Sequence, residues 1–171
     1  SFKQFPVQKG DCIVGDRGYS TPQGIAYVAS KDAHSLVRVN TGSLQFLRQD
    51  RNQFDLLTEV KSLKQAHGTK EWEVLINANG QLIAGRICVI RKSKASAEEA
   101  IKKLRRTANR KQKKLGKSTE GFAKYVILFT TLPREGYSLE SVLDWYRFRW
   151  QIELVFKRLK FFSGVRSSTQ T

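Results

Sequence analysis

The stretch YRFRWQIELVFKRLK, residues 146–160, decides how the end of this chain folds. Its residues predict one continuous helix, on which each residue advances the chain by about 100°. Four polar residues then share a stripe roughly 60° wide: Tyr146, Arg149, Glu153 and Lys160. The stripe is flanked by apolar side chains that we expect to face a core: Leu143, Trp145, Trp150, Ile152, Leu154, Phe156 and Leu159. A glutamate in that position loses hydration, so a cation must compensate its charge.

Two interpretations of Glu153 fit this stripe. In the first, Arg149 at i−4 or Lys157 at i+4 forms a partly buried ion pair with it and holds the helix to a sheet. In the second, Glu153 ligates a divalent metal while the basic groups and the Tyr146 hydroxyl bind phosphate. We favour the second, because these groups oversupply a single glutamate. Phosphoryl transfer on DNA commonly uses two metal ions.

Composition narrows the class of protein and its partners. The 171 residues suit one domain with a modest insertion, and 40% of them are hydrophobic, enough for a core. Thirty-one Lys and Arg against 15 Asp and Glu give a net charge of +16, which favours nucleic acid as the partner. An acidic membrane surface or an acidic protein is the alternative. No apolar run approaches the roughly 20 residues of a membrane span.

Cysteine and histidine usage argues against a disulfide or a zinc site. Cys12 and Cys88 each lie in an apolar, strand-like setting, so we expect buried free thiols in a reducing compartment. His34 and His67 show no ligand spacing.

The patterns along the chain predict a mixed α/β order. The expected elements are a strand at 12–14, a helix capped by Thr21 to about Lys31, strand 34–40, a short helix at 55–64, a hairpin over 71–93 turning at Asn79-Gly80, a basic helix from the cap Ser96 to about Lys114, a loop at 116–121, a buried strand at 125–129, and a final helix capped by Ser138. We divide the chain into 1–35 and 121–171 as core, 36–95 as a β-rich insertion, and 96–120 as a basic helix and loop.

A metal site needs a second carboxylate, and Asp16 is the candidate. It ends the first expected strand, and catalytic groups collect at strand ends in α/β folds. An Asp beside Gly also forms ordinary turns. The segment DRGY, residues 16–19, therefore leaves catalysis and turn chemistry equally open when taken alone.

Together these residues resemble one large group of bacterial insertion-sequence DDE transposases. The spacing Tyr146-x2-Arg149-x3-Glu153-x6-Lys160 is similar to the Tyr-Arg-Glu-Lys signature of that group, and DRGY is similar to its second-aspartate segment. The hairpin around Asn79-Gly80 and the TTLP after YVILF also look like the family, so the resemblance covers nearly the whole chain. It implies an α/β, ribonuclease-H-like fold, a mixed sheet flanked by helices, partial here and carrying a β-rich insertion.

The resemblance also implies roles for individual residues. Asp16 and Glu153 become catalytic metal ligands for Mg²⁺ or Mn²⁺, with two ions in the complete enzyme. Tyr146, Arg149 and Lys160 become contacts to the DNA backbone near the scissile phosphate. The implied partner is double-stranded DNA, bound by a homodimer at paired transposon ends in the bacterial cytoplasm, at the nucleoid. The family's first aspartate is expected upstream of Ser1, so we expect this chain to be a fragment or a degenerate copy that is inactive alone.

The basic helix offers a second DNA surface. It and the following loop carry nine cations: Lys102, Lys103, Arg105, Arg106, Arg110, Lys111, Lys113, Lys114 and Lys117. A sequence-independent DNA groove, in which Arg105 and Arg106 contact phosphates, is one interpretation. A solvated helix face with a buried stripe of Ala100, Ile101, Leu104 and Ala108 is the other. A non-catalytic DNA-binding module and a related nuclease stay open as alternative functions.

Overall fold

The structure is a computed structural model that describes residues 1–112 and 114–162, with side chains described for 1–112, 114–149 and 151. Its strands are β1 (Cys12–Gly15), β2 (His34–Arg38), β3 (Phe46–Leu47), β4 (Thr69–Ala78), β5 (Gln81–Arg91) and β6 (Tyr125–Thr130). Its helices are α1 (Pro22–Ala29), α2 (Leu56–Lys61), α3 (Lys94–Arg110), α4 (Lys117–Ala123) and α5 (Leu139–Phe162), with 3-10 turns η1 (Phe2–Gln4) and η2 (Arg17–Tyr19).

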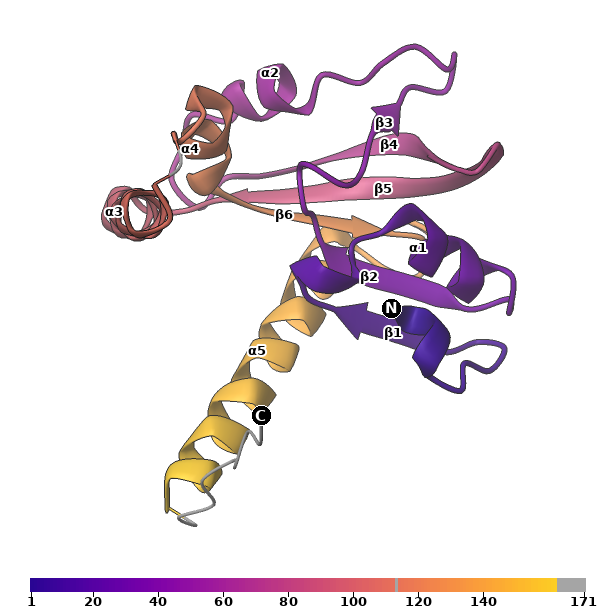
Figure 1. The fold of residues 1–171 in the computed structure, drawn as a ribbon. Coiled ribbons are helices and arrows are strands. Elements are labelled where there is room, and N and C mark those ends of the chain that lie inside the picture. The colour runs from indigo at the N-terminus through magenta and orange to yellow at the C-terminus, as the bar shows by residue number, and fades with distance from the viewer. Residues whose placement is uncertain (113, 163–171) are drawn as a thin grey trace.

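All six strands form one mixed sheet in the order β1-β2-β6-β5-β4-β3 (Figure 1). The pair β1–β2 is parallel, and the other pairs are antiparallel. This arrangement confirms the α/β prediction and is the mixed sheet with helices that a ribonuclease-H-like fold requires. The strands of the expected insertion belong to the same sheet as those of the expected core. The predicted boundary between core and insertion, after residue 35, falls inside β2. That division stays a prediction.

The β4–β5 hairpin forms where the sequence places it. Asn79 and Gly80 both have positive φ, 54° and 88°, as a tight two-residue turn requires. The Asn77 side chain accepts a hydrogen bond from the Gly80 amide at 2.8 Å, which closes the turn. Of the two hairpin strands, β4 also pairs with β3, and β5 also pairs with β6, so the hairpin lies between these strands in the sheet.

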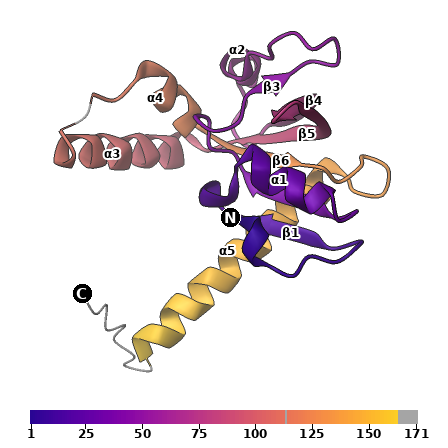
Figure 2. The ribbon, with the colours of Figure 1, turned by 45° about the vertical axis from the view of Figure 1, so that its right-hand side comes forward.

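Each face of the sheet carries its own core because strand side chains alternate. On one face, Ile127 and Phe129 pack with residues of α1 and α2 in the larger buried cluster. On the other face, Leu128 packs with Val142, Leu143 and other residues in a smaller cluster beneath the start of α5. The helix α5 therefore lies on the opposite face from α1, and its later turns extend beyond the sheet (Figures 1 and 2).

The helices near the basic segment begin and end differently from the prediction. Ser93, not Ser96, caps α3, and its hydroxyl accepts a hydrogen bond from the Ser96 amide at 3.2 Å. The helix ends at Arg110 rather than near Lys114. The segment expected to be a loop instead forms α4 after Gly116, because Phe122 packs against the larger cluster and anchors it.

Trp145 also departs from the expectation. It was expected to face the core with the other apolar flanks of the stripe, yet it is 40% exposed. Its ring contacts Tyr137 edge-on, with centroids 5.5 Å apart. Among the described side chains of α5, those that pack against the sheet belong to its first turns, and Trp145 contacts the loop before the helix instead.

Both cysteines are free, as predicted. Burial raises the pKa of Cys12 to about 11, and the pKa of Cys88 to about 12. Both thiols are therefore protonated and unreactive at neutral pH.

Candidate active site

Asp16 lies at the carboxyl end of β1, where its exposed carboxylate also caps η2. Its Oδ1 accepts a hydrogen bond from the Gly18 amide at 2.8 Å. The second carboxylate oxygen accepts no hydrogen bond from any residue whose side chain is described. Turn chemistry and ligand chemistry are thus compatible in this residue, since one oxygen shapes the turn while the other is open to a cation.

Asp16 and Arg38 lie at the same edge of the sheet. Because β1 and β2 are parallel and Gly15 pairs with Val37, Asp16 directly follows β1 and Arg38 ends β2 at that edge. Carboxyl ends of parallel strands are where α/β proteins gather their functional groups. The sequence analysis did not single out Arg38. Its place as the last residue of the second apolar strand was the available signal.

The helix α5, which carries the stripe, lies in the direction in which β1 points in Figure 1. Burial lowers the pKa of Arg17, repulsion from Arg38 lowers it further, and Tyr146 acts in the opposite direction. The approach of the stripe to Asp16 stays a prediction.

Tyr146 and Arg149 contact each other one turn apart on α5. Tyr146 is 8% exposed and belongs to the smaller buried cluster. The guanidinium carbon of Arg149 lies 5.3 Å from the centroid of the Tyr146 ring, which is a cation–π distance. The ring thus helps to fix where the Arg149 charge is held.

The side chains of the other candidate residues on α5 lie outside the described residues. These are Glu153 and Lys160 of the stripe, and Lys157, all within the helix Leu139–Phe162. The approach of Glu153 to Asp16 therefore stays a prediction. Among the side chains that the structure does describe, no three His, Cys, Asp or Glu residues are grouped as a metal site.

A buried ion-pair network fixes the start of α5. Arg86 on β5 is 4% exposed and pairs with Glu71 on β4, with 2.8 Å between Nη1 and Oε2. Its Nε donates to the Leu132 carbonyl at 3.0 Å and its Nη2 to the Tyr137 carbonyl at 2.5 Å. These carbonyls lie in the segment between β6 and α5. The hairpin therefore sets where the helix that carries the stripe leaves the sheet.

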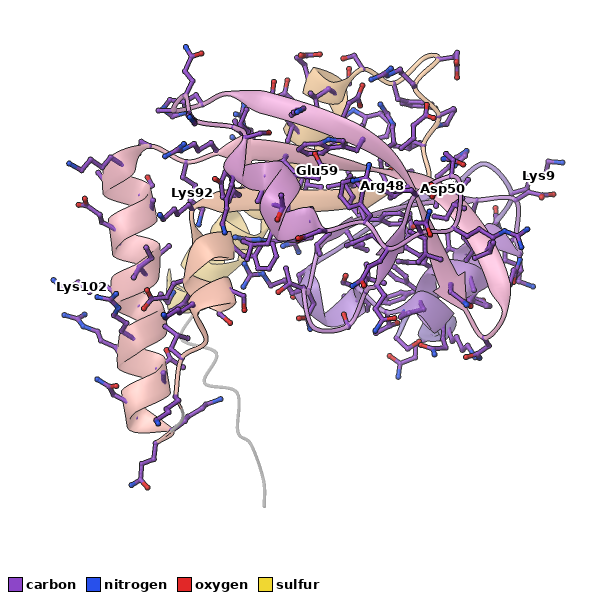
Figure 3. The ribbon with its side chains drawn as sticks, turned by 90° about the horizontal axis from the view of Figure 1, so that it is seen from above. Lys9, Arg48, Asp50, Glu59, Lys92 and Lys102 are labelled. Carbon is purple, nitrogen blue, oxygen red and sulfur yellow. The ribbon has the colours of Figure 1, made fainter. Side chains whose placement is uncertain are left out.

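The basic helix α3 lies away from the sheet, with none of its residues fully buried (Figure 2). Arg105 forms two hydrogen bonds with Glu120 on α4, at 2.7 and 3.0 Å. This pairing raises the pKa of Arg105 and lowers the pKa of Glu120. Arg106 is exposed, and Lys102 points into solvent in Figure 3. No helix in the described part of the chain combines the length and apolar character needed to cross a bilayer.

Lys92, at the end of β5, is a second functional candidate that the sequence analysis missed. Burial lowers its pKa to about 8, and repulsion from Arg38 and Arg17 contributes. Its Nζ donates to the Ala123 carbonyl at 2.7 Å. Lys92 thus joins the positive charge at the strand ends although it is far from Asp16 in the sequence. A lysine in a run such as RKSK carries no sequence signal of that kind.

The mixed α/β sheet with helices on both faces agrees with the fold of a DDE-type transposase domain. The family model described as transposase DDE domain matches residues 2–171. The chain therefore belongs to the transposase DDE domain family, as the sequence resemblance predicted.

Individual relatives agree with this assignment. The transposase for insertion sequence element IS421 of Escherichia coli is 34% identical over 163 residues, covering 92% of this chain and 44% of that protein. The transposases for IS231E and IS231F, from the finitimus and israelensis subspecies of Bacillus thuringiensis, are 24% and 22% identical, each covering 90% of this chain and 35% of the relative. The chain thus spans less than half the length of these relatives. No solved structure matches it significantly.

Proposed function

We propose that this chain is part of a transposase that cleaves DNA at the ends of an insertion sequence and transfers the cut strands. The observations that carry the proposal are the transposase DDE domain match over residues 2–171 and the position of Asp16 directly after a strand of a parallel pair. Arg149 stands over the Tyr146 ring on α5. The proposal brings Asp16 and these phosphate-binding groups to one edge of the sheet.

The acidic groups fit a divalent metal. Asp16 is exposed and has one carboxylate oxygen open to a ligand. Asp16 and Glu153 would hold Mg²⁺ or Mn²⁺, with a further aspartate from the part of the relatives' length that this chain does not cover. The metal, as two ions in the complete enzyme, would activate the attacking oxygen and stabilise the leaving oxygen of the DNA strand. The chain alone would then bind DNA without cutting it.

The DNA partner is bound through two sets of basic groups. Arg149 with Tyr146, followed by Lys157 and Lys160 about two and three turns further on, would hold the backbone beside the scissile phosphate. A guanidinium grips phosphate through paired hydrogen bonds, and an ammonium acts as a point charge. Arg105 and Arg106 would contact the flanking duplex along α3. Two copies would act together on paired ends, at the nucleoid in the cytoplasm.

The test is metal-dependent nicking of a transposon-end duplex. It uses a protein that contains this chain together with the rest of the length its relatives have. We expect Mg²⁺-dependent strand cleavage that is abolished by Asp16→Asn and by Glu153→Gln. Glu120→Gln, which removes a surface carboxylate paired only with Arg105 among the described residues, should leave cleavage intact.

The outcome separates the proposal from its alternative. If Asp16→Asn and Glu153→Gln change nothing in an active protein, these residues do not hold the metal. If the extended protein binds DNA but no metal supports cleavage, the chain belongs to a non-catalytic DNA-binding module. A product that is cut but never joined to a second strand would instead indicate a nuclease.

A further inference from the structure

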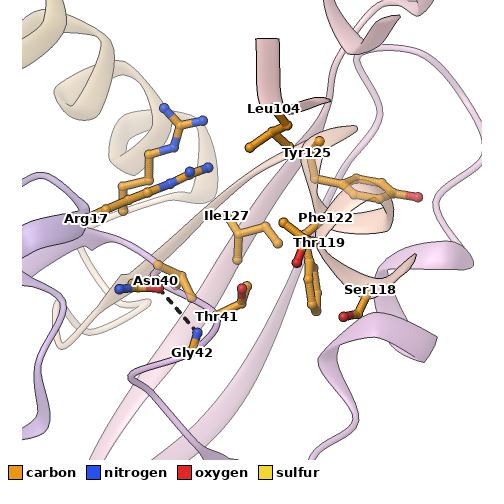
Figure 4. A pocket seen from close by; sticks show the side chains of 13 residues that line it. Arg17, Asn40, Thr41, Gly42, Leu104, Ser118, Thr119, Phe122, Tyr125 and Ile127 are labelled. Atoms are coloured by element: carbon orange, nitrogen blue, oxygen red, sulfur yellow. Dashed lines mark hydrogen bonds between the residues drawn. The ribbon is translucent and has the colours of Figure 1, made fainter. Parts of the chain in front are cut away.

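A cavity of about 430 Å³ lies next to the strand ends that carry Asp16 and Arg38. The residues that line it come from η2, from the end of β2 and the segment that follows it, and from α3, α4 and β6. Arg17 reaches in from one side, and Thr119 and Phe122 of α4 line the other side (Figure 4). The cavity therefore adjoins the candidate active site without including its acidic residue.

The walls of this cavity are positive and contain no carboxylate. Arg17 and Arg38 both line it. Lys92, nearby, has a pKa of about 8, because of burial first and then repulsion from Arg38 and Arg17. Asp16 is adjacent to Arg17 in the sequence, but it does not line the cavity. Arg17, Arg38 and Lys92 form no ion pair with any described carboxylate.

Several hydrogen-bonding groups of the cavity also have no partner among the described residues. The Nε of Arg38 is buried and has no hydrogen-bond partner among the described residues. Buried charged donors are rarely left without an acceptor. The hydroxyls of Thr41, Ser118 and Thr119 make no hydrogen bond to any described side chain or carbonyl. The cavity therefore offers several donors and two guanidinium groups to a ligand that supplies acceptors and negative charge.

We propose that this cavity binds a backbone phosphate of the DNA strand that runs past Asp16, at a position flanking the one that is cut. A phosphodiester supplies two charged oxygens, which match guanidinium and hydroxyl donors. The inference rests on the proposed function for its source of phosphate. It adds to that function a contact made by Arg38 and the α4 hydroxyls, apart from the stripe on α5.

The first experiment measures DNA binding against salt concentration with this chain. Each phosphate contact contributes about 0.9 to the slope of log K against log[salt] for duplex DNA. We expect Arg38→Gln to reduce the magnitude of the slope by about one contact. Arg38→Lys should retain most of the slope but weaken binding, because an ammonium lacks the paired donors of a guanidinium.

Arg48→Gln is the matched control. Arg48 pairs with Glu59 on α2, at 2.9 Å (both are labelled in Figure 3), and it is not among the residues that line the cavity. Its removal should leave the slope unchanged. Circular dichroism establishes that each variant is folded. A folded Arg38→Gln variant with an unchanged slope would overturn the proposal.

A second measurement needs no substitution in the cavity. The pKa of the Lys92 ammonium is followed by NMR in the unaltered chain, with inorganic phosphate and separately with a short DNA duplex as the probe. An anion in the cavity favours the charged ammonium, so the pKa should rise from about 8 with either probe. A rise with phosphate alone would identify a free-phosphate site and overturn the DNA assignment. No rise with either probe would overturn the site altogether.

The proposed function and this inference can fail separately. The binding and NMR measurements require no metal and no strand cleavage, and they can be repeated with Asp16→Asn. If cleavage is never observed but Arg38→Gln lowers the salt slope, the catalytic proposal fails and the phosphate site stands. If cleavage depends on Asp16 but neither measurement responds, the cavity is not a DNA contact.

Discussion

Glu71 and Arg86 form a buried ion pair across the β4–β5 hairpin, with 2.8 Å between the carboxylate and the guanidinium. Arg134, in the segment that leads to α5, pairs with the other oxygen of Glu71. The guanidinium of Arg86 also donates hydrogen bonds to the carbonyls of Leu132 and Tyr137. The charge of one glutamate therefore ties the strands of the expected insertion to the helix that carries the signature stripe.

Replacing Arg86 by Met should destabilise the chain by roughly 3–5 kcal/mol, because it leaves a carboxylate and two carbonyls without their buried donor. Arg134 would still pair with Glu71, which places the expected value near the lower end. The measurement is urea unfolding followed by circular dichroism. Arg105→Gln, in the exposed pair with Glu120, should leave the midpoint almost unchanged. Equal effects of the two substitutions would contradict this account of α5.

Asp16→Asn should leave the stability of the fold nearly unchanged but remove metal-dependent cleavage. Asn caps a turn about as well as Asp, so we expect the free energy of unfolding to change by no more than about 0.5 kcal/mol. In the extended protein, the same substitution should remove metal-dependent cleavage, because a neutral amide is a poor ligand for Mg²⁺. Unfolding curves test the expected stability, and nicking assays on the same preparation test the expected loss of cleavage. A large loss of stability would show that the residue is mainly structural.

Neutralising the exposed side of α3 should weaken DNA binding and its salt dependence. The variant replaces four exposed cations by Gln: Lys102, Lys103, Arg106 and Arg110. Each one that contacts a phosphate contributes about 0.9 to the salt slope. We expect the slope to fall by two to four such contacts, roughly, in a fluorescence anisotropy titration at several salt concentrations.

The control for α3 removes the same charge elsewhere. It replaces four exposed cations far from α3 in the sequence: Lys3, Lys9, Lys31 and Arg51. Lys9 and Lys102 lie at opposite ends of the molecule in Figure 3. If the two variants lose the same slope, α3 is not a DNA surface and net charge alone explains the binding.

Lys92 should make stability rise with pH above neutrality. Its pKa in the folded chain, about 8, is below the ordinary value of 10.5, so the unfolded chain binds more protons between these pH values. Stability attributable to Lys92 therefore increases as pH rises from about 8 to about 10.5, and the penalty is full below 8. Because the side chain is only partly buried, solvent screens the effect and we expect less than about 2 kcal/mol.

The measurement compares Lys92→Met with the unaltered chain at several pH values. The stability difference between them should shift in favour of the unaltered chain across this range. Lys102→Met, on the exposed side of α3, should show no such shift. A pH-independent difference for Lys92→Met would mean that the lysine is charged throughout.

Local sequence patterns were sufficient for most individual elements. Short apolar runs rich in β-forming residues predicted the strands, and Asn79-Gly80 predicted the hairpin turn, because both depend on backbone and side-chain preferences of adjacent residues. The Tyr146–Lys160 spacing pointed to the family for a similar reason, since it is fixed by the geometry of one helix. Errors occurred where packing decided the outcome. Phe122 anchors α4 in a segment that reads as a loop, and Trp145 is exposed although it is apolar.

The sequence by itself determined the kind of protein and the residues of its signature, because those lie close together along the chain. Only the tertiary structure decided which distant residues join them. Arg38 and Asp16 reach the same sheet edge because β1 and β2 run parallel in register, and Lys92, which follows β5, experiences repulsion from Arg38 and Arg17. Electrostatic repulsion and burial depend on separation in space, which no local pattern of residues encodes.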